Sequence, residues 1–484
     1  MKLRAMLFGA VLGSALGLGF AAAQTDATPV PAPAPAASSS APATPNPSAP
    51  KPESPPAAAT APAPATADAP VPLTPPSAPA PGAASGGPAA SPIPVEAAAP
   101  KPKKKPPPPP PPLETALSTD PAPTFRPDTF FATAKAAERY QAIVQAGGWP
   151  TDIVALRPGA KGPAVARLRK RLVIEGDLQP VEGPAAQVWG KDLTEAVKKF
   201  QERMGLRQTG NIAGATLKEI NVSAEVRHTQ LAASAQRLQN VNFAFAERYV
   251  VVNLPSTSVE AVEGGRVAHR YVAIVGDVDH PSPEISAQIS VINLNPTWTV
   301  PVSIIKKEII PKMQKDPGYL TRTKIRILDG SGAEINPKSI DWNTERAANY
   351  TLRQDSGASN SLGAIRIGMP NKLAVYMHDT PSKRLFGADY RFLSHGCVRV
   401  QVVYDLAEWL LQGTPDPSGG AWDKVALLAK VSDGARLDIR LAKPTPVIWV
   451  YLTGWANADG AANFRNDVYG IDVAGEASAN AATQ

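Results

Sequence analysis

Apolar residues recur with a helical period in the part of the chain that follows residue 125. Between residues 130 and 148 they include Ala136, Tyr140 and Ile143, and Gly147-Gly148 ends the pattern. Residues 156–222 carry two amphipathic patterns and a short third one. The second of these repeats at i, i+3, i+4, i+7 and i+11 through Leu193, Ala196, Val197, Phe200 and Met204. With a further helix expected between residues 224 and 247, the folded part begins as a helical region.

From residue 248 onward the pattern changes to short β-branched runs separated by Gly, Pro, Asn and Asp. Strands are predicted at residues 248–254, 268–275, 288–294, 364–369, 374–377 and 398–400. Between residues 303 and 350 a charged, helix-like stretch from Ile304 to Ile310 and then loops interrupt this pattern. Insertions of this size beside a functional site commonly act as lids. We therefore expect a mostly β domain with an inserted cap.

The N-terminal segment has the pattern of an export signal. Lys2 and Arg4 precede an apolar run from residue 5 to residue 20, and three alanines follow before Gln24. The apolar run is shorter than the roughly 20 residues that span a bilayer, which favours cleavage; an uncleaved membrane anchor is the alternative. We expect a signal peptide over residues 1–23 and a location in the periplasm.

A long Pro- and Ala-rich segment follows the signal. Residues 24–125 are mostly Ala, Pro, Ser and Thr, and a lysine cluster at 101–105 leads into seven consecutive prolines, 106–112. Such a composition buries too little apolar surface to offset the entropy of ordering, so a disordered, partly polyproline-II linker is predicted. It could hold the folded part near a membrane or an envelope polymer. The formal net charge of +7 is modest and comes with no basic nucleic-acid motif, so no nucleic-acid partner is expected.

The candidate chemistry centres on the single cysteine of the chain. Cys397 lies in the small-residue run Ser394-His395-Gly396-Cys397, and a lone thiol in an exported protein has no disulfide partner. A cysteine nucleophile needs a base, and His378, nineteen positions earlier, could supply it from a neighbouring strand. An inert buried cysteine and a structural histidine are the plain alternatives. One Cys and five His without ligand spacing argue against zinc, so neither metal nor cofactor is expected.

One motif resembles the signature of L,D-transpeptidases with a YkuD-type catalytic domain. In it His378 is followed, after fifteen residues, by Ser394-His395-Gly396-Cys397, with Arg399 beyond. Residues 156–222 resemble the three-helix peptidoglycan-binding domain, and the insertion resembles the capping subdomain of the larger Gram-negative, YcbB-like subgroup. The implied fold is multidomain, with a mostly β YkuD-like sandwich and a helical or loop cap. The expected boundaries are 1–23 signal peptide, 24–125 linker, 126–153 helical scaffold segment, 154–223 peptidoglycan-binding-like domain, 224–247 connecting helix, 248–455 catalytic domain with the cap at about 303–350, and 456–484 C-terminal tail.

The resemblance also implies roles for individual residues. Cys397 would be the nucleophile and His378 the proton donor and acceptor, oriented by the backbone carbonyl of Asp379. Gly396 would let backbone amides face the developing oxyanion. Substrate contacts are expected from Arg399, Tyr376, Trp298, His395 and Ser394. A core tyrosine at 376, a structural salt bridge at Arg399 and His395 as a rival base remain open.

The resemblance implies an acyl transfer on peptidoglycan stem peptides. Cys397 would form a thioester with a tetrapeptide stem, release terminal D-alanine and pass the acyl group to an amine, which makes 3-3 crosslinks. Carbapenem-type β-lactams are the expected inhibitors. A noncatalytic wall-binding protein with a decayed catalytic domain, and a hydrolase that uses water as acceptor, are the competing hypotheses.

Overall fold

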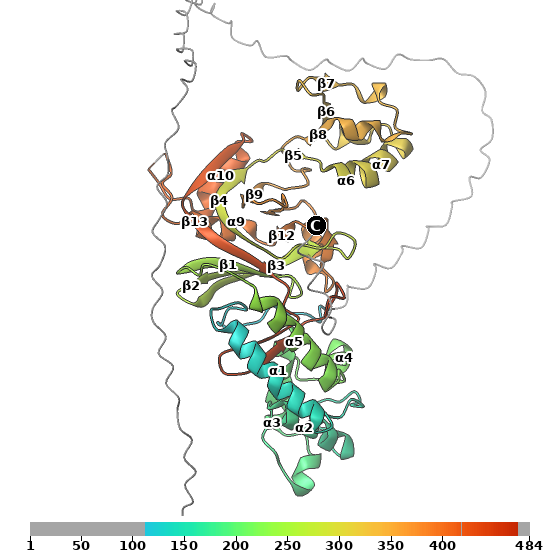
Figure 1. Cartoon of the computed structure of the whole chain (residues 1–484), viewed down its shortest axis with the longest axis vertical. Helices are drawn as coiled ribbons and strands as arrows, with labels where there is room; N and C mark the ends of the chain where they lie inside the picture. Colours follow the sequence, from blue (N-terminus) through green and yellow to red (C-terminus); the bar gives the residue numbers. More distant parts are fainter. Residues whose placement is uncertain (1–111, 418, 473–484) are drawn as a thin grey trace, which may run out of the picture. The chain divides into compact units, whose positions relative to one another are not determined.

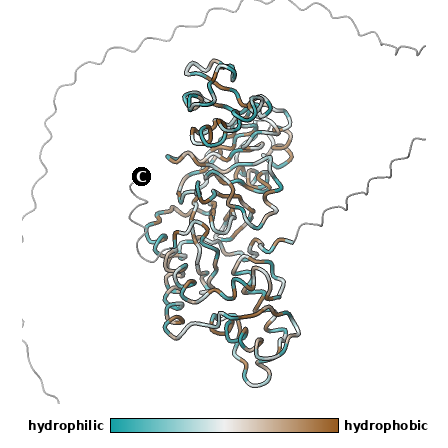
Figure 2. The backbone as a smooth tube through the Cα atoms, turned by 90° about the vertical axis from the view of Figure 1, so that its right-hand side faces the viewer, coloured by the Kyte–Doolittle hydropathy of each residue, from teal (hydrophilic) through white to brown (hydrophobic). Residues whose placement is uncertain are grey.

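The computed structural model describes residues 112–417 and 419–472. The predicted signal peptide and most of the predicted linker lie outside these residues. Within them, no helix is both long and apolar enough to cross a bilayer. Figure 2 shows hydrophobic and hydrophilic positions alternating along the traced chain, as expected for elements that are buried on one side.

The described chain begins with a helical region, as the periodicity predicted. Its helices are α1 (Thr129–Gln145), α2 (Pro163–Glu175), the 3-10 turn η1 (Gly183–Gln187), α3 (Lys191–Arg203), α4 (Gly214–Ile220) and α5 (Ala224–Gln239). The apolar stripe of α3 is buried, with Leu193, Val197 and Phe200 fully inaccessible. Helix α2 ends where Gly176 adopts a left-handed conformation, which a residue without Cβ accommodates best. In Figure 1 these helices gather on one side of the main sheet.

The second half is built on one large sheet. Its strands are β1 (Arg248–Asn253), β2 (Ser258–Glu263), β3 (Arg266–Gly276), β4 (Ile285–Leu294), β9 (Ile365–Gly368), β10 (Met377–His378), β11 (Phe392–Ser394), β12 (Val398–Val400) and β13 (Leu437–Val450). Their order is β11-β3-β12-β10-β9-β4-β13-β1-β2. Because β2 pairs with β3 as well as with β1, the sheet closes on itself. The main apolar core lies on its inner face and includes α9 (Val403–Leu411); α10 (Lys424–Ser432) packs beside α9.

A second apolar cluster joins this sheet to the helical region. Val251 of β1 and Ile448 of β13 point away from the main core, because neighbouring residues on a strand face opposite sides. They pack with Leu238 at the end of α5 and with Phe125 and Phe243. The sheet is therefore buried on both faces along β1 and β13, and the helical region contributes to its stability.

The insertion forms a cap with a core of its own. It contains one continuous helical segment made of α6 (Val302–Ile304), the π turn η2 (Ile305–Ile309) and α7 (Ile310–Lys315). The short helix α8 (Tyr319–Arg322) follows. A small sheet in the order β5-β8-β6-β7 completes the cap; its strands are β5 (Trp298–Thr299), β6 (Ile325–Leu328), β7 (Glu334–Ile335) and β8 (Thr351–Gln354). The 3-10 turns η3 (Pro337–Ser339) and η4 (Glu345–Asn349) connect β7 to β8. The apolar side of this segment packs on itself.

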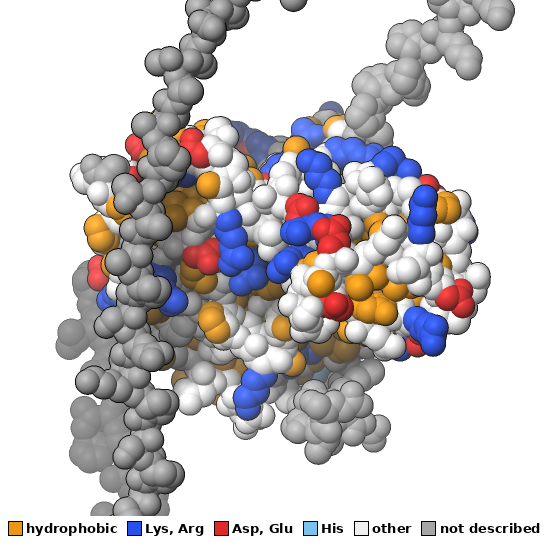
Figure 3. Space-filling model, turned by 90° about the horizontal axis from the view of Figure 1, so that it is seen from above, with side chains coloured by type: hydrophobic (Ala, Val, Ile, Leu, Met, Phe, Trp, Pro, Cys, Tyr) orange, Lys and Arg blue, Asp and Glu red, His pale blue; other side chains and the backbone are white. Residues whose placement is uncertain are grey.

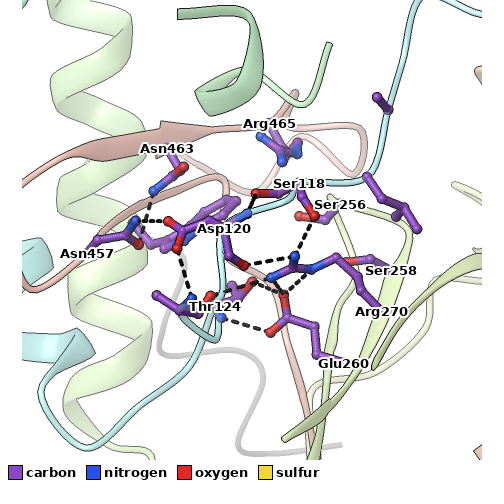
Figure 4. A pocket seen from close by; sticks show the side chains of 14 residues that line it. Ser118, Asp120, Thr124, Ser256, Ser258, Glu260, Arg270, Asn457, Asn463 and Arg465 are labelled. Atoms are coloured by element: carbon purple, nitrogen blue, oxygen red, sulfur yellow. Dashed lines mark hydrogen bonds and ion pairs between the residues drawn. The ribbon is translucent and has the colours of Figure 1, made fainter. Parts of the chain in front are cut away.

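Two of the expected boundaries need correction. We expected a disordered linker up to residue 125, but residues 113–125 form a strap that is bound to the folded part. Thr124 donates hydrogen bonds from its backbone and its hydroxyl to buried Glu260, at 2.8 and 2.9 Å, and Arg270 donates to the carbonyl oxygens of Ser118 and Asp120 (Figure 4). Short polar residues can order a Pro-rich segment when backbone groups find buried partners.

The expected C-terminal tail is likewise folded. Strands β14 (Gly454–Ala456) and β15 (Ala462–Phe464) form a hairpin, and Phe464 is fully buried in the core of the helical region. Asn457 of this hairpin also donates a hydrogen bond to Asp120 of the strap, at 2.5 Å (Figure 4). The chain therefore returns from the sheet to the helices before residue 472.

Candidate active site

Two short parallel strands bring the distant motifs together. Strand β10 pairs with β12 so that Met377 lies opposite Val398 and His378 lies opposite Arg399. Met377 and Val398 are fully buried in the main core. Since side chains alternate along a strand, the other face carries Tyr376, His378, Cys397 and Arg399.

A cavity of about 260 Å³ opens on this face. Seven of the nine predicted site residues line it, whereas Gly396 and Asp379 support it from behind. The cap, which was expected to act as a lid, forms a second wall of the cavity. None of its lining residues was predicted individually. The lining residues from the β domain and the β5 strand are Trp298, Ser361, Leu362, Tyr376, His378, Ser394, His395, Cys397 and Arg399, and those from the cap are Pro301, Ile304, Glu308, Ile309, Lys312 and Tyr319.

His378 is held in one tautomer. Its Nδ1 lies 2.5 Å from the carbonyl oxygen of Asp379, and a carbonyl can only accept, so Nδ1 carries the proton and Nε2 keeps a free lone pair. The carboxylate of Asp379 is engaged elsewhere, by the amide of Ala364 and by Lys383. Burial lowers the pKa of His378 to about 3, and the positive charge of Arg399 adds to this effect. The imidazole is therefore neutral at neutral pH.

Cys397 is a neutral thiol in the resting state. Burial raises its pKa above the ordinary cysteine value, while a hydrogen bond from Tyr376 and the charge of Arg399 work in the opposite direction without overcoming it. A cysteine and a histidine can react in two ways: the thiol proton moves to His378 during attack, or the two groups already form a thiolate–imidazolium pair. The two pKa directions favour a neutral pair whose proton moves only when substrate is attacked.

Tyr376 lines the cavity and also packs against the main core. The side chains of Cys397 and Trp298 lie close enough to its hydroxyl to affect its pKa, and the guanidinium of Arg366 lies 5.0 Å from the centre of its ring. The tyrosine thus lies between Cys397 and Trp298, which was expected to contact substrate. Arg366 was missed, although its place in a four-residue strand next to β10 puts it opposite His378.

The turn that presents Cys397 is tied to the C-terminal segment. Gly396 has a φ of +101°, a left-handed conformation that favours glycine. Ser394 Oγ donates to the carbonyl oxygen of Cys397 at 2.5 Å, and Ser282 Oγ donates to that of Gly396 at 2.7 Å. The backbone amide of Ser282 in turn donates to the hydroxyl of Tyr469 at 3.2 Å. Ser394 therefore supports the turn; the contacts of Ser282 with Gly396 and Tyr469 were not predicted.

Arg399 has no salt-bridge partner among residues 112–417 and 419–472. Its Nε is buried without a hydrogen-bond partner there, and the titratable groups near it are Cys397 and Glu308. The structural salt bridge considered above is thus not formed. A guanidinium that is buried in a cavity wall and unpaired is suited to a carboxylate ligand.

His395 contacts the cap instead of the thiol. Its Nε2 lies 2.9 Å from Glu308 Oε1, and Lys312 holds the same carboxylate at 2.5 Å. The ring of His280 lies 4.5 Å from that of His395, and Lys307 Nζ is 3.0 Å from His280 Nε2. The i,i+4 spacing of Glu308 and Lys312 is typical of an ion pair on a helix. Nothing in the sequence showed that this helix lies over Cys397. In the part of the chain described, no group of three His, Cys, Asp or Glu side chains is arranged to hold a metal ion.

Comparisons with known proteins agree with this geometry. Residues 247–417 match the family described as "L,D-transpeptidase catalytic domain" (YkuD), and residues 161–220 match a "Putative peptidoglycan binding domain". Residues 247–417 are thus similar to a YkuD-type L,D-transpeptidase domain. A Haemophilus influenzae protein described as "Putative L,D-transpeptidase" is 32% identical over 259 residues, which are 53% of this chain and 50% of that protein. The chain thus spans about half the length of this curated relative.

Solved L,D-transpeptidase structures were also found. One from Xylanimonas cellulosilytica is 15% identical and covers 61% of this chain and 97% of its own, with a TM-score of 0.18. One from Stackebrandtia nassauensis is 14% identical and covers 52% and 88%, with a TM-score of 0.23. The assignment of the L,D-transpeptidase domain rests on the family models and the curated relative.

Proposed function

We propose that this protein is a peptidoglycan L,D-transpeptidase that works through Cys397. The sulfur attacks the carbonyl that joins the third, diamino-acid residue of a stem peptide to its terminal D-alanine. The carbon–nitrogen bond breaks, a thioester forms and D-alanine leaves. An acceptor amine then attacks the thioester carbonyl, which restores the thiol and makes a 3-3 crosslink.

His378 carries the proton in both half-reactions. Its Nε2 takes the proton from the thiol as sulfur attacks and passes it to the leaving amine; it later takes a proton from the acceptor amine and returns it to sulfur. An imidazole with a pKa near 3 is a weak base, so proton transfer accompanies attack. Gly396 and Cys397 supply backbone amides for the oxyanion, and Arg399 supplies a fork for a stem carboxylate.

The observation that supports this proposal best is the fixed tautomer of His378 in the cavity that holds Cys397. A noncatalytic wall-binding protein would not need a histidine whose Nδ1 is committed to a carbonyl, which leaves the lone pair on Nε2. A hydrolase shares the first half-reaction. The two-walled cavity favours transfer over hydrolysis, because the cap shields a thioester from water.

We further propose that the protein acts in the periplasm, exported by its N-terminal signal and reaching the wall through its linker. Support comes from the sequence of residues 1–125 and from the peptidoglycan-binding-like domain. The +7 formal charge is compatible with an anionic polymer. On the face seen in Figure 3, basic and acidic side chains are interspersed, so the described surface there offers no continuous patch of one sign.

The test is turnover of a purified tetrapeptide stem by the exported chain, followed by mass spectrometry of both products and protein. Wild type should lose D-alanine from the donor and form crosslinked dimers, and a carbapenem should add one inhibitor mass at Cys397. Cys397→Ser should abolish all three signals. His378→Gln should do nearly the same, whereas His395→Gln, the matched control, should retain turnover. Crosslinking by Cys397→Ser would refute the mechanism, and free tripeptide without dimer would identify a hydrolase.

A further inference from the structure

A second cavity adjoins the one that holds Cys397. Its volume is about 380 Å³, and four residues line both cavities: Trp298, Pro301, Leu362 and Tyr376. A ligand that enters one can therefore extend into the other past Tyr376, whose hydroxyl contacts the nucleophile.

The second cavity is cationic. Three arginines line it, Arg353 from β8, Arg366 from β9 and Arg436 just before β13, and none of its lining residues is acidic. Arg436 pairs with Asp438 at 3.1 Å on the surface. Neither Arg353 nor Arg366 forms an ion pair within residues 112–417 and 419–472, and the Nε of each is buried there without a hydrogen-bond partner.

The position of Arg353 is unfavourable for the fold alone. In the cap sheet it lies directly opposite Arg326, and like charges in such a pair destabilise a sheet. The nearby carboxylate, Asp355, pairs with Arg326 at 2.5 Å, so the charge of Arg353 is left uncompensated. A charge that costs stability and points into a cavity is a candidate for ligand binding.

Arg366 links this charge to the reacting centre. It lies opposite His378 across β9 and β10, and its guanidinium stacks over the ring of Tyr376. Aromatic stacking fixes the plane of a guanidinium and leaves its edge free for a planar anion. Arg366 lines the second cavity, so a ligand there can reach it, although its charge also acts on Asp438.

We propose that Arg353 and Arg366 form a carboxylate subsite that binds the free carboxylates of a stem peptide whose other part lies at Cys397. This proposal rests on the proposed function for the identity of the ligand. The ligand is a peptide with a carboxylate beside its reacting residue. Both the donor stem and the acceptor stem have this feature. Since charge-assisted hydrogen bonds are stronger than neutral ones, the expected effect of each arginine is about tenfold in affinity.

The experiment compares two peptides on the full chain: a tetrapeptide stem with free side-chain carboxylates and the same peptide with those groups amidated. Binding is measured by calorimetry on Cys397→Ser, which cannot turn over, in the presence of Arg353→Gln, Arg366→Gln or no further change. Arg346→Gln is the control, since Arg346 is an exposed arginine of the cap that lines neither cavity. Thermal melting confirms that each variant is folded.

We expect the free-carboxylate peptide to bind about tenfold more weakly to each of the Arg353 and Arg366 variants and with unchanged affinity to the Arg346 variant. The amidated peptide should bind equally weakly to all of them. Equal loss for both peptides, or no loss with Arg353→Gln, overturns the subsite. In the proteins with Cys397 intact, slower formation of the thioester assigns the subsite to the donor, and normal acylation with slower dimer formation assigns it to the acceptor. If wild type turns over neither peptide, the proposed function fails while the binding comparison still decides the subsite.

Discussion

The state of Cys397 before substrate arrives is set by burial. Its pKa lies above the ordinary thiol value, and the hydrogen bond from Tyr376 lowers it. We therefore expect alkylation of Cys397 by a small uncharged reagent to be slow at neutral pH and to rise at a pH above that for free cysteine. Tyr376→Phe removes the contribution of the hydroxyl but keeps that of the backbone, so it should move the profile only slightly higher. Intact-protein mass against pH gives both curves, and a midpoint near pH 7 would indicate the preformed ion pair that the structure argues against.

The buried imidazole of His378 predicts a second pH effect, on stability. Its folded pKa of about 3 lies below that of an exposed histidine, about 6.5, so the unfolded chain binds the proton first as pH falls. The free energy of unfolding attributable to this group is therefore full above pH 6.5 and declines below it, by up to about 1.4 kcal/mol per pH unit.

Denaturant melts of wild type and His378→Gln between pH 7.5 and pH 4.5 check this. The variant should be less stable at pH 7.5 and lose less stability on acidification, because it has no proton to take up. His395, whose pKa burial also lowers, is present in both proteins and cancels in the comparison. Parallel curves would show that His378 titrates normally.

At the scale of elements, the cap helix meets the cysteine motif through Glu308. This carboxylate bridges His395 and Lys312, and both its side chain and that of His395 are about one-third exposed, 32% each. Glu308→Gln should therefore weaken closure of the cap modestly and slow crosslinking by about two- to fivefold, in line with a partly exposed ion pair. Acylation by a small β-lactam should change less, since the nucleophile is placed by β10 and β12.

Glu345→Gln is the control for this prediction. Glu345 pairs with Lys306 of the same helix segment at 2.6 Å but is 70% exposed and lies outside the cavity. Dimer formation and acylation are measured for both variants from the same preparations. Equal losses of acylation and crosslinking in Glu308→Gln would show that the cap belongs to the catalytic core and is not a lid.

Sequence patterns predicted the elements that are regular by themselves and missed those that depend on distant partners. The stripe of α3 and the β-branched run of β1 were both evident. Strand β13 (Leu437–Val450) was missed although it pairs with β1 and β4, because Pro444 and Pro446 within it break the usual strand pattern. In the active site the motif residues were found from their spacing, whereas Arg366, Glu308 and Tyr469 reach it only through tertiary contacts.

At the scale of the whole molecule, the strap at residues 113–125 and the C-terminal hairpin tie the helical region to the sheet. Arg270 and Glu260, whose side chains are only 11% and 2% exposed, pair with one another and with backbone groups of the strap (Figure 4). Asp389, five residues before Ser394, accepts hydrogen bonds from the backbone of Glu114 and Thr115. The start of the folded part is thus attached near the strand that leads into the cysteine motif.

This arrangement predicts that two truncations of the Pro- and Ala-rich segment differ in their effect on stability, although composition alone predicts the same effect for both. Removal of residues 25–111 should leave stability and turnover of soluble stem peptides unchanged, because a Pro- and Ala-rich spacer adds nothing to the active-site geometry. Removal of residues 25–125 should lower the melting temperature by several degrees. Arg270 and Glu260 then lose buried hydrogen-bond partners, at about 1–3 kcal/mol for each unsatisfied group, and the apolar cluster loses Phe125.

Thr124→Val in the full chain removes one of the same hydrogen bonds to Glu260, so it should also lower the melting temperature, but by less than the longer truncation. Calorimetric melts of the three proteins beside wild type measure this; equal melting temperatures for the two truncations would mean that the strap is bound without contributing to stability.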